Sequence, residues 1–189
     1  MARNLVDTDA HGLRDAYALL DLSEVVIMDA LDLLRVDHQR IGRLIQQVEN
    51  ELDPQTGQAS AQSFEKLTRE IRTHKQMLQK CLYPELEAVG QIDTYLALDS
   101  KIQKSMDDLI ASIEQNQPPE QGWRNRLDEL RELWHTHVEQ SENRLFPEAL
   151  RLLGTTRLQQ MEFDMDAVRT HQSDFDSSIY PASRLGPKT

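Results

Sequence analysis

Three histidines occupy inward positions in this chain of 189 residues. His38, His74 and His137 each lie three or four residues from apolar neighbours on one face of a predicted helix. Imidazole nitrogens are common metal ligands, and a buried histidine needs either a metal ion or a hydrogen-bond partner. We therefore expect these side chains to form either a metal site or a cluster of hydrogen-bonded neutral rings.

The chain also contains an internal duplication. Leu82-Tyr83-Pro84-Glu85 follows His74 at the separation at which Leu145-Phe146-Pro147-Glu148 follows His137, and the two copies are 63 residues apart. A repeated helix pair indicates a bundle with pseudo-twofold symmetry, in which equivalent residues of the two halves meet in the middle.

Nearly the same offset relates the first and third predicted helices. It pairs Asp37-His38-Gln39-Arg40-Ile41 with Leu98-Asp99-Ser100-Lys101-Ile102. Asp99 is then the counterpart of His38, although Leu98 competes with it for the inward position. A metal site in a bundle core requires side chains that project inward from facing helices at one level, and this pairing predicts such a level.

The elements that position these side chains are predicted to be long helices. Apolar residues recur at steps of three and four, and no alternating stretch is long enough for a strand. Proline and glycine mark helix ends near residues 53–57, at Gly90, near residues 117–122 and at Gly154. Helices are predicted at about residues 22–52, 61–88, 92–114, 123–153 and 156–175, after a short amphipathic segment at about 13–20.

This pattern predicts an all-α fold, an up-down-up-down four-helix bundle with a short N-terminal helix and an additional C-terminal helix. We expect an N-terminal extension at residues 1–25, the bundle at 26–154, the additional helix packed on the bundle at 155–178, and a flexible tail at 179–189. On the additional helix His171 is expected to face the core. His135 is expected to face outward, because it lies about 200° from His137 around the helix.

The charge of the chain argues against nucleic acid as a partner. The formal net charge is -11, with Lys and Arg interleaved among acids, and such a surface repels a polyanion. No stretch approaches the roughly 18 apolar residues of a membrane span, and the first residues lack the apolar core of a secretion signal. The single cysteine, Cys81, fits a reducing compartment. We therefore expect a cytoplasmic protein with no membrane partner.

The motifs around the histidines resemble the hemerythrin-like, HHE cation-binding family. The run that ends at Asp37-His38 is similar to that family's first helix, in which the histidine follows an acidic residue. His74 with Leu82-Tyr83-Pro84 is similar to the second helix, and His137 with Leu145-Phe146-Pro147 is similar to the fourth. The resemblance covers about residues 29–150 and implies a bundle that binds a pair of irons, one held by each half.

The resemblance also implies carboxylates that join the two irons, four residues after the second-helix and fourth-helix histidines. Those positions are Leu78 and Ser141 here, and Asp99 stands where the family has a third-helix histidine. Two cations a few ångströms apart repel strongly unless anions lie between them, so the metal site is degenerate. Glu142 stands five residues after the fourth-helix histidine, a position that some hemerythrins use, and its first-half counterpart is the neutral Gln79.

Two interpretations of this site stay open. The first is a single metal ion, non-haem iron or another divalent cation, held by some members of the set His38, His74, Asp99, His137 and Glu142. The second is a metal-free core in which neutral imidazoles bond to Gln79, Ser141 or Asp99.

Three functions are compatible with these observations. The resemblance implies a binding protein that senses or carries a small diatomic ligand such as oxygen or nitric oxide, or serves in a stress response. The alternative is a metal-free interaction scaffold for a protein partner. An enzyme ranks last, because the sequence has no serine triad, phosphate-binding glycine loop or paired core carboxylates, and we expect none.

Overall fold

The computed structural model describes residues 28–52, 60–90, 92–116 and 120–179. The predicted N-terminal extension, the amphipathic segment at 13–20 and residues 180–189 of the predicted tail lie outside these ranges. Among the helices of the described ranges, none combines the length and apolar character needed to cross a membrane.

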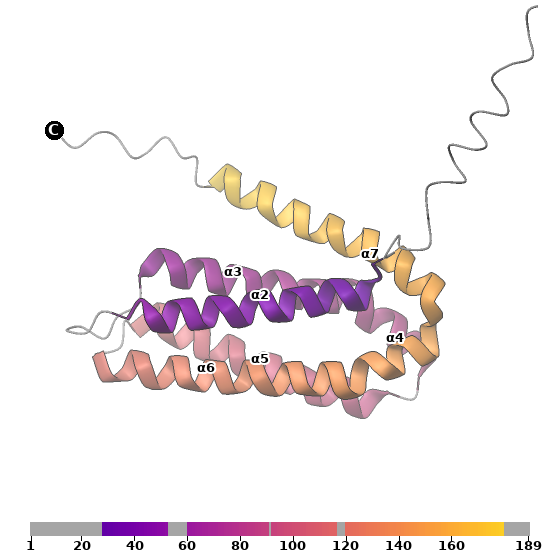
Figure 1. Cartoon of the computed structure of the whole chain (residues 1–189), viewed down its shortest axis with the longest axis horizontal. Coiled ribbons are helices and arrows are strands. Elements are labelled where there is room, and N and C mark those ends of the chain that lie inside the picture. The colour runs from indigo at the N-terminus through magenta and orange to yellow at the C-terminus, as the bar shows by residue number, and fades with distance from the viewer. Residues whose placement is uncertain (1–27, 53–59, 91, 117–119, 180–189) are drawn as a thin grey trace, which may run out of the picture.

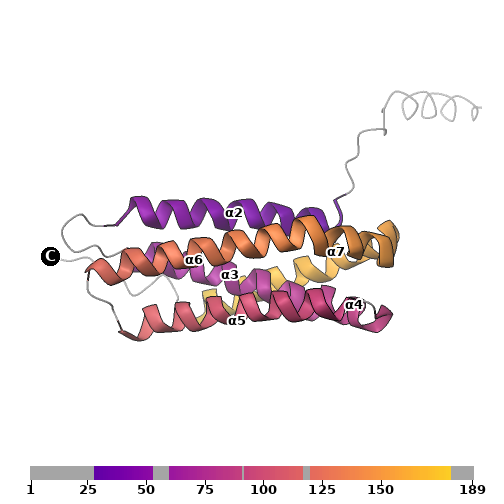
Figure 2. The same cartoon turned by 90° about the horizontal axis from the view of Figure 1, so that it is seen from below.

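The regular elements of the described ranges are all helical. In chain order they are α2 (Ala30–Asn50), α3 (Ala61–Met77), η2 (Leu78–Leu82), α4 (Tyr83–Val89), α5 (Asp93–Asn116), α6 (Glu120–Gln140), η3 (Ser141–Leu145) and α7 (Phe146–Ile179). The π-helical turns η2 and η3 continue the path of their neighbours, so that α3 leads into α4 and α6 leads into α7 (Figure 1). Helices α2, α3, α5 and α6 run alternately up and down along one axis (Figure 2). The predicted all-α four-helix bundle is confirmed.

Helix α2 begins at Ala30 because Asp29 caps it. The Asp29 carboxylate accepts hydrogen bonds from the backbone N–H groups of Leu31 and Asp32, at 2.8 and 3.0 Å. The Asp32 carboxylate accepts one in return from the Asp29 backbone N–H, which completes a capping box. The sequence predicted a helix from about residue 22, but residues 28 and 29 are not helical. At these two residues the prediction is wrong, because the capping box overrides the apolar periodicity.

The core consists of two apolar clusters with a polar layer between them. On α2, His38 lies between Leu34 of the first cluster and Ile41 of the second. On α3, His74 lies between Ile71 of the second cluster and Met77 of the first. The buried polar side chains at this level therefore have apolar packing both above and below them, which keeps bulk water away from the histidines.

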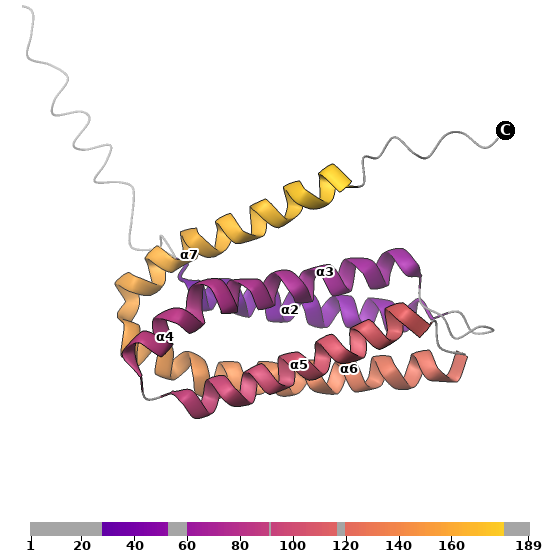
Figure 3. The same cartoon turned by 180° about the vertical axis from the view of Figure 1, so that it is seen from behind.

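Glycine ends both halves of the duplication. Gly90 has φ 68° and ψ −177°, and Gly154 has φ 72° and ψ 163°. Side chains with a Cβ rarely adopt these conformations. At Gly154 the chain turns back, so that residues 155–179 of α7, called here the C-terminal segment, return along α2 and α3 (Figures 1 and 3).

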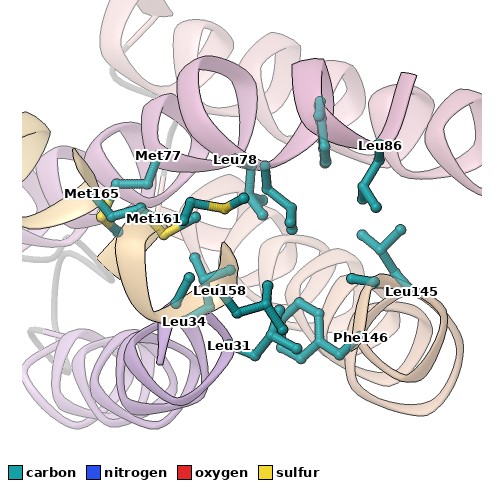
Figure 4. Close-up of a cluster of buried hydrophobic side chains, with 14 of the residues drawn as sticks. Leu31, Leu34, Met77, Leu78, Leu86, Leu145, Phe146, Leu158, Met161 and Met165 are labelled. Carbon is teal, nitrogen blue, oxygen red and sulfur yellow. The ribbon is translucent and has the colours of Figure 1, made fainter. Parts of the chain in front are cut away.

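Apolar packing and an ion pair hold the C-terminal segment on the bundle. Leu158, Met161 and Met165 are at most 1% exposed and belong to the first apolar cluster, together with Met77 of α3 (Figure 4). The Arg157 guanidinium donates two hydrogen bonds to the Glu85 carboxylate of α4, at 2.6 and 3.1 Å.

Burial of the C-terminal segment decreases beyond Met165. Val168 is only partly buried, and His171 is exposed. The prediction that His171 faces the core is therefore wrong, because the helix face that continues the methionine stripe no longer meets the bundle there. The prediction that His135 faces outward is confirmed.

The two glycines at Gly154 and Gly42 are expected to respond oppositely to a methyl group. Gly154→Ala forces a Cβ into a conformation that costs about 1–3 kcal/mol. Gly42→Ala, inside α2, should instead stabilise the protein by up to about 1 kcal/mol, since helical alanine is favoured over glycine. No heavy atom lies within 4 Å of an added Cβ at either position, so backbone conformation alone decides the sign. Urea unfolding of both variants would measure the two changes, and equal effects would contradict the assignment.

Candidate metal centre

Three imidazole rings from three helices meet in the polar layer. His38 comes from α2, His74 from α3 and His137 from α6. Their ring centroids are 4.9 to 5.3 Å apart, and one nitrogen from each ring lies within 4.8 Å of one nitrogen from each of the others. The shortest approach is 3.2 Å, between Nε2 of His74 and Nε2 of His137. All three side chains are at most 3% exposed.

A carboxylate lies behind each of these rings, on the Nδ1 side. Nδ1 of His38 is 2.7 Å from Glu142 Oε1, and Nδ1 of His137 is 2.6 Å from Asp99 Oδ1. The third pair is an ion-pair contact and not a hydrogen bond: His74 Nδ1 lies 3.6 Å from Asp37 Oδ2 and has no hydrogen-bond partner. An ionised carboxylate only accepts hydrogen bonds, so each of these Nδ1 atoms favours the hydrogen, and in a neutral ring Nε2 then has a lone pair.

This arrangement leaves an Nε2 lone pair on each ring, and those of His74 and His137 face each other. His38 Nε2 is buried without a hydrogen-bond partner, and the Nε2 atoms of His74 and His137 lie so close that either a hydrogen on one of them or a cation must separate their lone pairs. A metal at about 2.1 Å from each nitrogen places two ligands about 3.0 to 3.4 Å apart, depending on the angle between them. The 3.2 Å separation of the His74 and His137 nitrogens fits that range, and the His38 ligand atom lies within 4.8 Å of both. The donor set therefore suits a transition-metal cation.

Comparison with known families agrees with this geometry. The Hemerythrin HHE cation binding domain matches residues 29–149, which include all three histidines and both π-helical turns. The chain belongs to the hemerythrin HHE family. The match ends before Gly154, so the C-terminal segment lies outside it.

A curated relative of this hemerythrin-like chain is described as a DNA nickase, from Nostoc sp. (strain PCC 7120 / SAG 25.82 / UTEX 2576). The two are 24% identical over 144 residues, which cover 76% of this chain and 40% of that protein. The chain thus spans less than half the length of this relative. No solved structure matches the chain.

The positions at which the family resemblance implies bridging carboxylates begin the two π-helical turns. Leu78 begins η2 and Ser141 begins η3, at the same 63-residue separation as His74 and His137. Leu78 is fully buried and Ser141 is 1% exposed, with its hydroxyl oxygen lacking a hydrogen-bond partner. Isolated π-helical turns often mark functional sites, and both turns of this hemerythrin-like bundle lie directly after a histidine helix.

The structure brings all five predicted site residues together, but only the histidines lie at the centre of the cluster. The three histidines share the central side of the cluster, whereas Asp99 and Glu142 contact the outer Nδ1 atoms. Direct metal binding by these two carboxylates stays a prediction. Asp99 is 3% exposed and Leu98 is 41% exposed, which decides the inward position on α5. Gln79 is exposed, so the expectation that it bonds to a buried histidine is wrong.

Sequence reasoning missed three buried residues that support the rings. Tyr83 donates its hydroxyl to Asp99 Oδ2, and Gln103 Nε2 donates to the same oxygen at 2.8 Å. Both residues could have been found from the sequence, because Gln103 lies one helical turn after Asp99 and Tyr83 belongs to the duplicated tetrapeptide. No sequence pattern predicted that Asp37 would support His74, because Asp37 is adjacent to His38 and points to a different side of α2.

Burial keeps two of the histidines neutral. The pKa of His38 is lowered far below its ordinary value, first by burial and then by repulsion from His74, His137 and Arg35. Burial also lowers the pKa of His74, although Asp37 opposes that shift. Neutral imidazole is the form that binds a metal ion, so both rings are ready for it at neutral pH.

These lowered pKa values predict acid sensitivity of the metal-free protein. The unfolded chain takes up protons at His38 and His74 as the pH falls through 6.5, while the folded protein does not. Stability should therefore fall with pH below 6.5, by up to about 3 kcal/mol per pH unit for two such groups. Asp37, whose folded pKa is lowered by His74 and two arginines despite burial, adds a further loss below 3.8.

Urea unfolding from pH 7 to pH 5 would measure this slope. His38→Asn should reduce the slope by about half, since one of the two groups is lost. His135→Asn, which alters an exposed histidine on the helix that carries His137, is the matched control and should leave the slope unchanged. A wild-type stability that stays level over this interval would show that the buried rings are not neutral.

Proposed function

We propose that this hemerythrin-like chain holds one divalent metal ion, with non-haem iron as the expected occupant, on His38, His74 and His137. The observation that carries the proposal is the convergence of three buried imidazole rings, each of which has a carboxylate on its Nδ1 side. Three carboxylates around a dication also supply the negative charge that a buried cation needs.

We propose one metal ion instead of two because the second half of the duplication has been altered. Asp99, the counterpart of His38, is already bonded by Tyr83 and Gln103 and turned toward the back of His137. In the first half, the fully buried side chain of Leu78 offers no bridging ligand either. Without anions between them, two cations at this level would repel strongly.

We further propose that the site senses or carries a small diatomic ligand such as oxygen or nitric oxide, with a role in a stress response. A metal ion here would supply an open coordination position for such a ligand. A cavity of about 10 Å³ adjoins His74, His137 and Gln103, and such a volume has room for one water-sized molecule. The Gln103 Oε1 atom, buried without a partner, can accept a hydrogen bond from a water molecule in this cavity.

The surrounding residues orient the rings and exclude water. Trp134 meets all three imidazoles, with centroid distances of 5.1 to 5.7 Å, and Phe146 stacks on His38 at 5.6 Å with an interplanar angle of 8°. These aromatic faces separate the nitrogens from bulk solvent. A dry site strengthens the attraction between the imidazole dipoles and a cation.

We also propose that the chain acts by binding and not by catalysis, in the cytoplasm and without a nucleic-acid partner. Asp37 and Asp99 accept hydrogen bonds from arginine, tyrosine and glutamine donors, and Glu142 is engaged with His38, so the three carboxylates beside the rings are not free to act as bases. The formal charge of -11 disfavours contact with DNA. The alternative is a metal-free bundle that serves as an interaction scaffold, in which His74 and His137 share one proton between their Nε2 atoms.

Metal analysis of protein purified without an affinity tag tests the metal proposal. We expect about one iron or other divalent ion per wild-type chain, and close to none in His38→Ala or His137→Ala, since three donors are needed to hold it. His135→Ala removes an exposed histidine and should keep the wild-type content. A wild-type content far below one ion per chain would refute the proposal and favour the scaffold.

Iron loading without oxygen, followed by exposure to air, tests the number of ions. An oxo-bridged pair absorbs visible light strongly, and a single ion in this site should not. Strong visible bands at two irons per chain would show that the altered half still binds its metal.

The nickase relative suggests a direct test of the nucleic-acid proposal. Supercoiled plasmid incubated with the iron-loaded protein should stay supercoiled, because an acidic surface repels the phosphate backbone. Conversion to the open circular form, absent with His38→Ala, would assign strand cleavage to this chain and overturn the proposal.

A further inference from the structure

Asp37 links the histidine cluster to a part of the chain outside the family match. Its side chain is 2% exposed, and its Oδ2 atom faces His74 Nδ1 at 3.6 Å. Its other oxygen, Oδ1, accepts hydrogen bonds from Arg40 at 2.8 Å and from Arg169 at 2.5 Å. Arg169 belongs to the C-terminal segment and is 132 residues distant in sequence.

The two arginines differ in how firmly they are committed to this carboxylate. Arg40 lies one helical turn away on α2 and also pairs with Glu70 of α3 at 2.9 Å. Arg169 approaches from α7, and its side chain is 26% exposed, more shielded than that of Arg40 at 37%. A buried carboxylate requires donors, so removing Arg169 leaves Asp37 with a donor that Glu70 also attracts.

The C-terminal segment is placed to deliver Arg169. Met165, one helical turn earlier, is fully buried in the first apolar cluster beside α2 and α3. Docking of this stripe sets the position of the helix turn that carries Arg169. The ion pair between Arg157 and Glu85 lies elsewhere on the same segment and does not touch Asp37.

We propose that Arg169 is a positioning residue of the histidine site, which holds Asp37 and through it fixes the ring of His74. This inference rests on the proposed metal function. The partners of the other two rings are held within residues 29–149, with Asp99 bonded by Tyr83 and Gln103, and Glu142 on η3. Among the described residues, His74 is thus the ring whose support depends on the C-terminal segment.

The expected consequence is weaker metal binding when the Arg169 contact is lost. Carboxylates that orient a ligating imidazole typically change metal affinity by roughly 10- to 100-fold. Arg169 acts one contact further out, so Arg169→Met should raise the dissociation constant for Co²⁺ by roughly tenfold. Arg169→Lys keeps a cation near Asp37 and should recover part of that loss.

Co²⁺ titration of the full chain, with a competing chelator, tests the proposal against a structural explanation. Arg157→Met is the matched control, because it removes the other ion pair of the same segment, and its affinity for Co²⁺ should equal that of the wild type. In an Asp37→Asn background, Arg169→Met should cause no further loss, since it acts through that carboxylate. Equal losses from both arginine variants, or additive losses with Asp37→Asn, would overturn the proposal.

The tautomer of His74 in the metal-free protein gives a readout that does not depend on metal binding. Imidazole ¹⁵N chemical shifts at one fixed pH should show hydrogen on Nδ1 in the wild type and in Arg157→Met, and a mixture in Arg169→Met. An unchanged tautomer in Arg169→Met would contradict the positioning role. If Arg169→Met changes the tautomer of His74 but the wild-type protein binds no Co²⁺, the positioning role stands and only the proposed metal function is refuted.

Discussion

The position of a carboxylate beside each imidazole determines the chemistry of this bundle. A carboxylate at Nδ1 leaves Nε2 of a neutral ring as an acceptor, and three such rings meet where apolar clusters exclude water. Burial prevents the rings from relieving this conflict by taking up protons freely. Either a cation among the rings or a hydrogen between the Nε2 atoms of His74 and His137 resolves this conflict, and the buried donors suit a metal site.

The two halves of the duplication have diverged in a physically consistent way. The first half has His38 where the second half has Asp99. The aromatic residues that face these two side chains, Phe146 and Tyr83, differ by one hydroxyl group. Phe146 stacks its ring on His38, whereas Tyr83, its counterpart, donates a hydrogen bond to Asp99. A buried ring needs apolar contact and a buried carboxylate needs donors, so each replacement is matched by its partner across the pseudo-twofold axis.

The C-terminal segment contributes to this layer although it lies outside the family match. Gly154 turns the chain back, the methionine stripe docks it, and Arg169 then supplies a donor to the buried Asp37. A carboxylate that is nearly inaccessible to water is stable only with such partners. The polar layer is therefore completed by contacts from five segments of chain, and not by the four bundle helices alone.

The sequence by itself determined the helices, the bundle and the inward direction of the three histidines, because periodicity and helix breakers act over short distances along the chain. The 63-residue repeat was sufficient to bring His74 and His137 to one level. Only the tertiary structure decided whether Leu98 or Asp99 faces the core, and only it showed that His171 is exposed. It also placed Glu142 beside His38 and Asp37 beside His74. Such contacts join residues as far as 104 and 132 positions apart, and they depend on the rotation and spacing of packed helices, which helical periodicity does not specify.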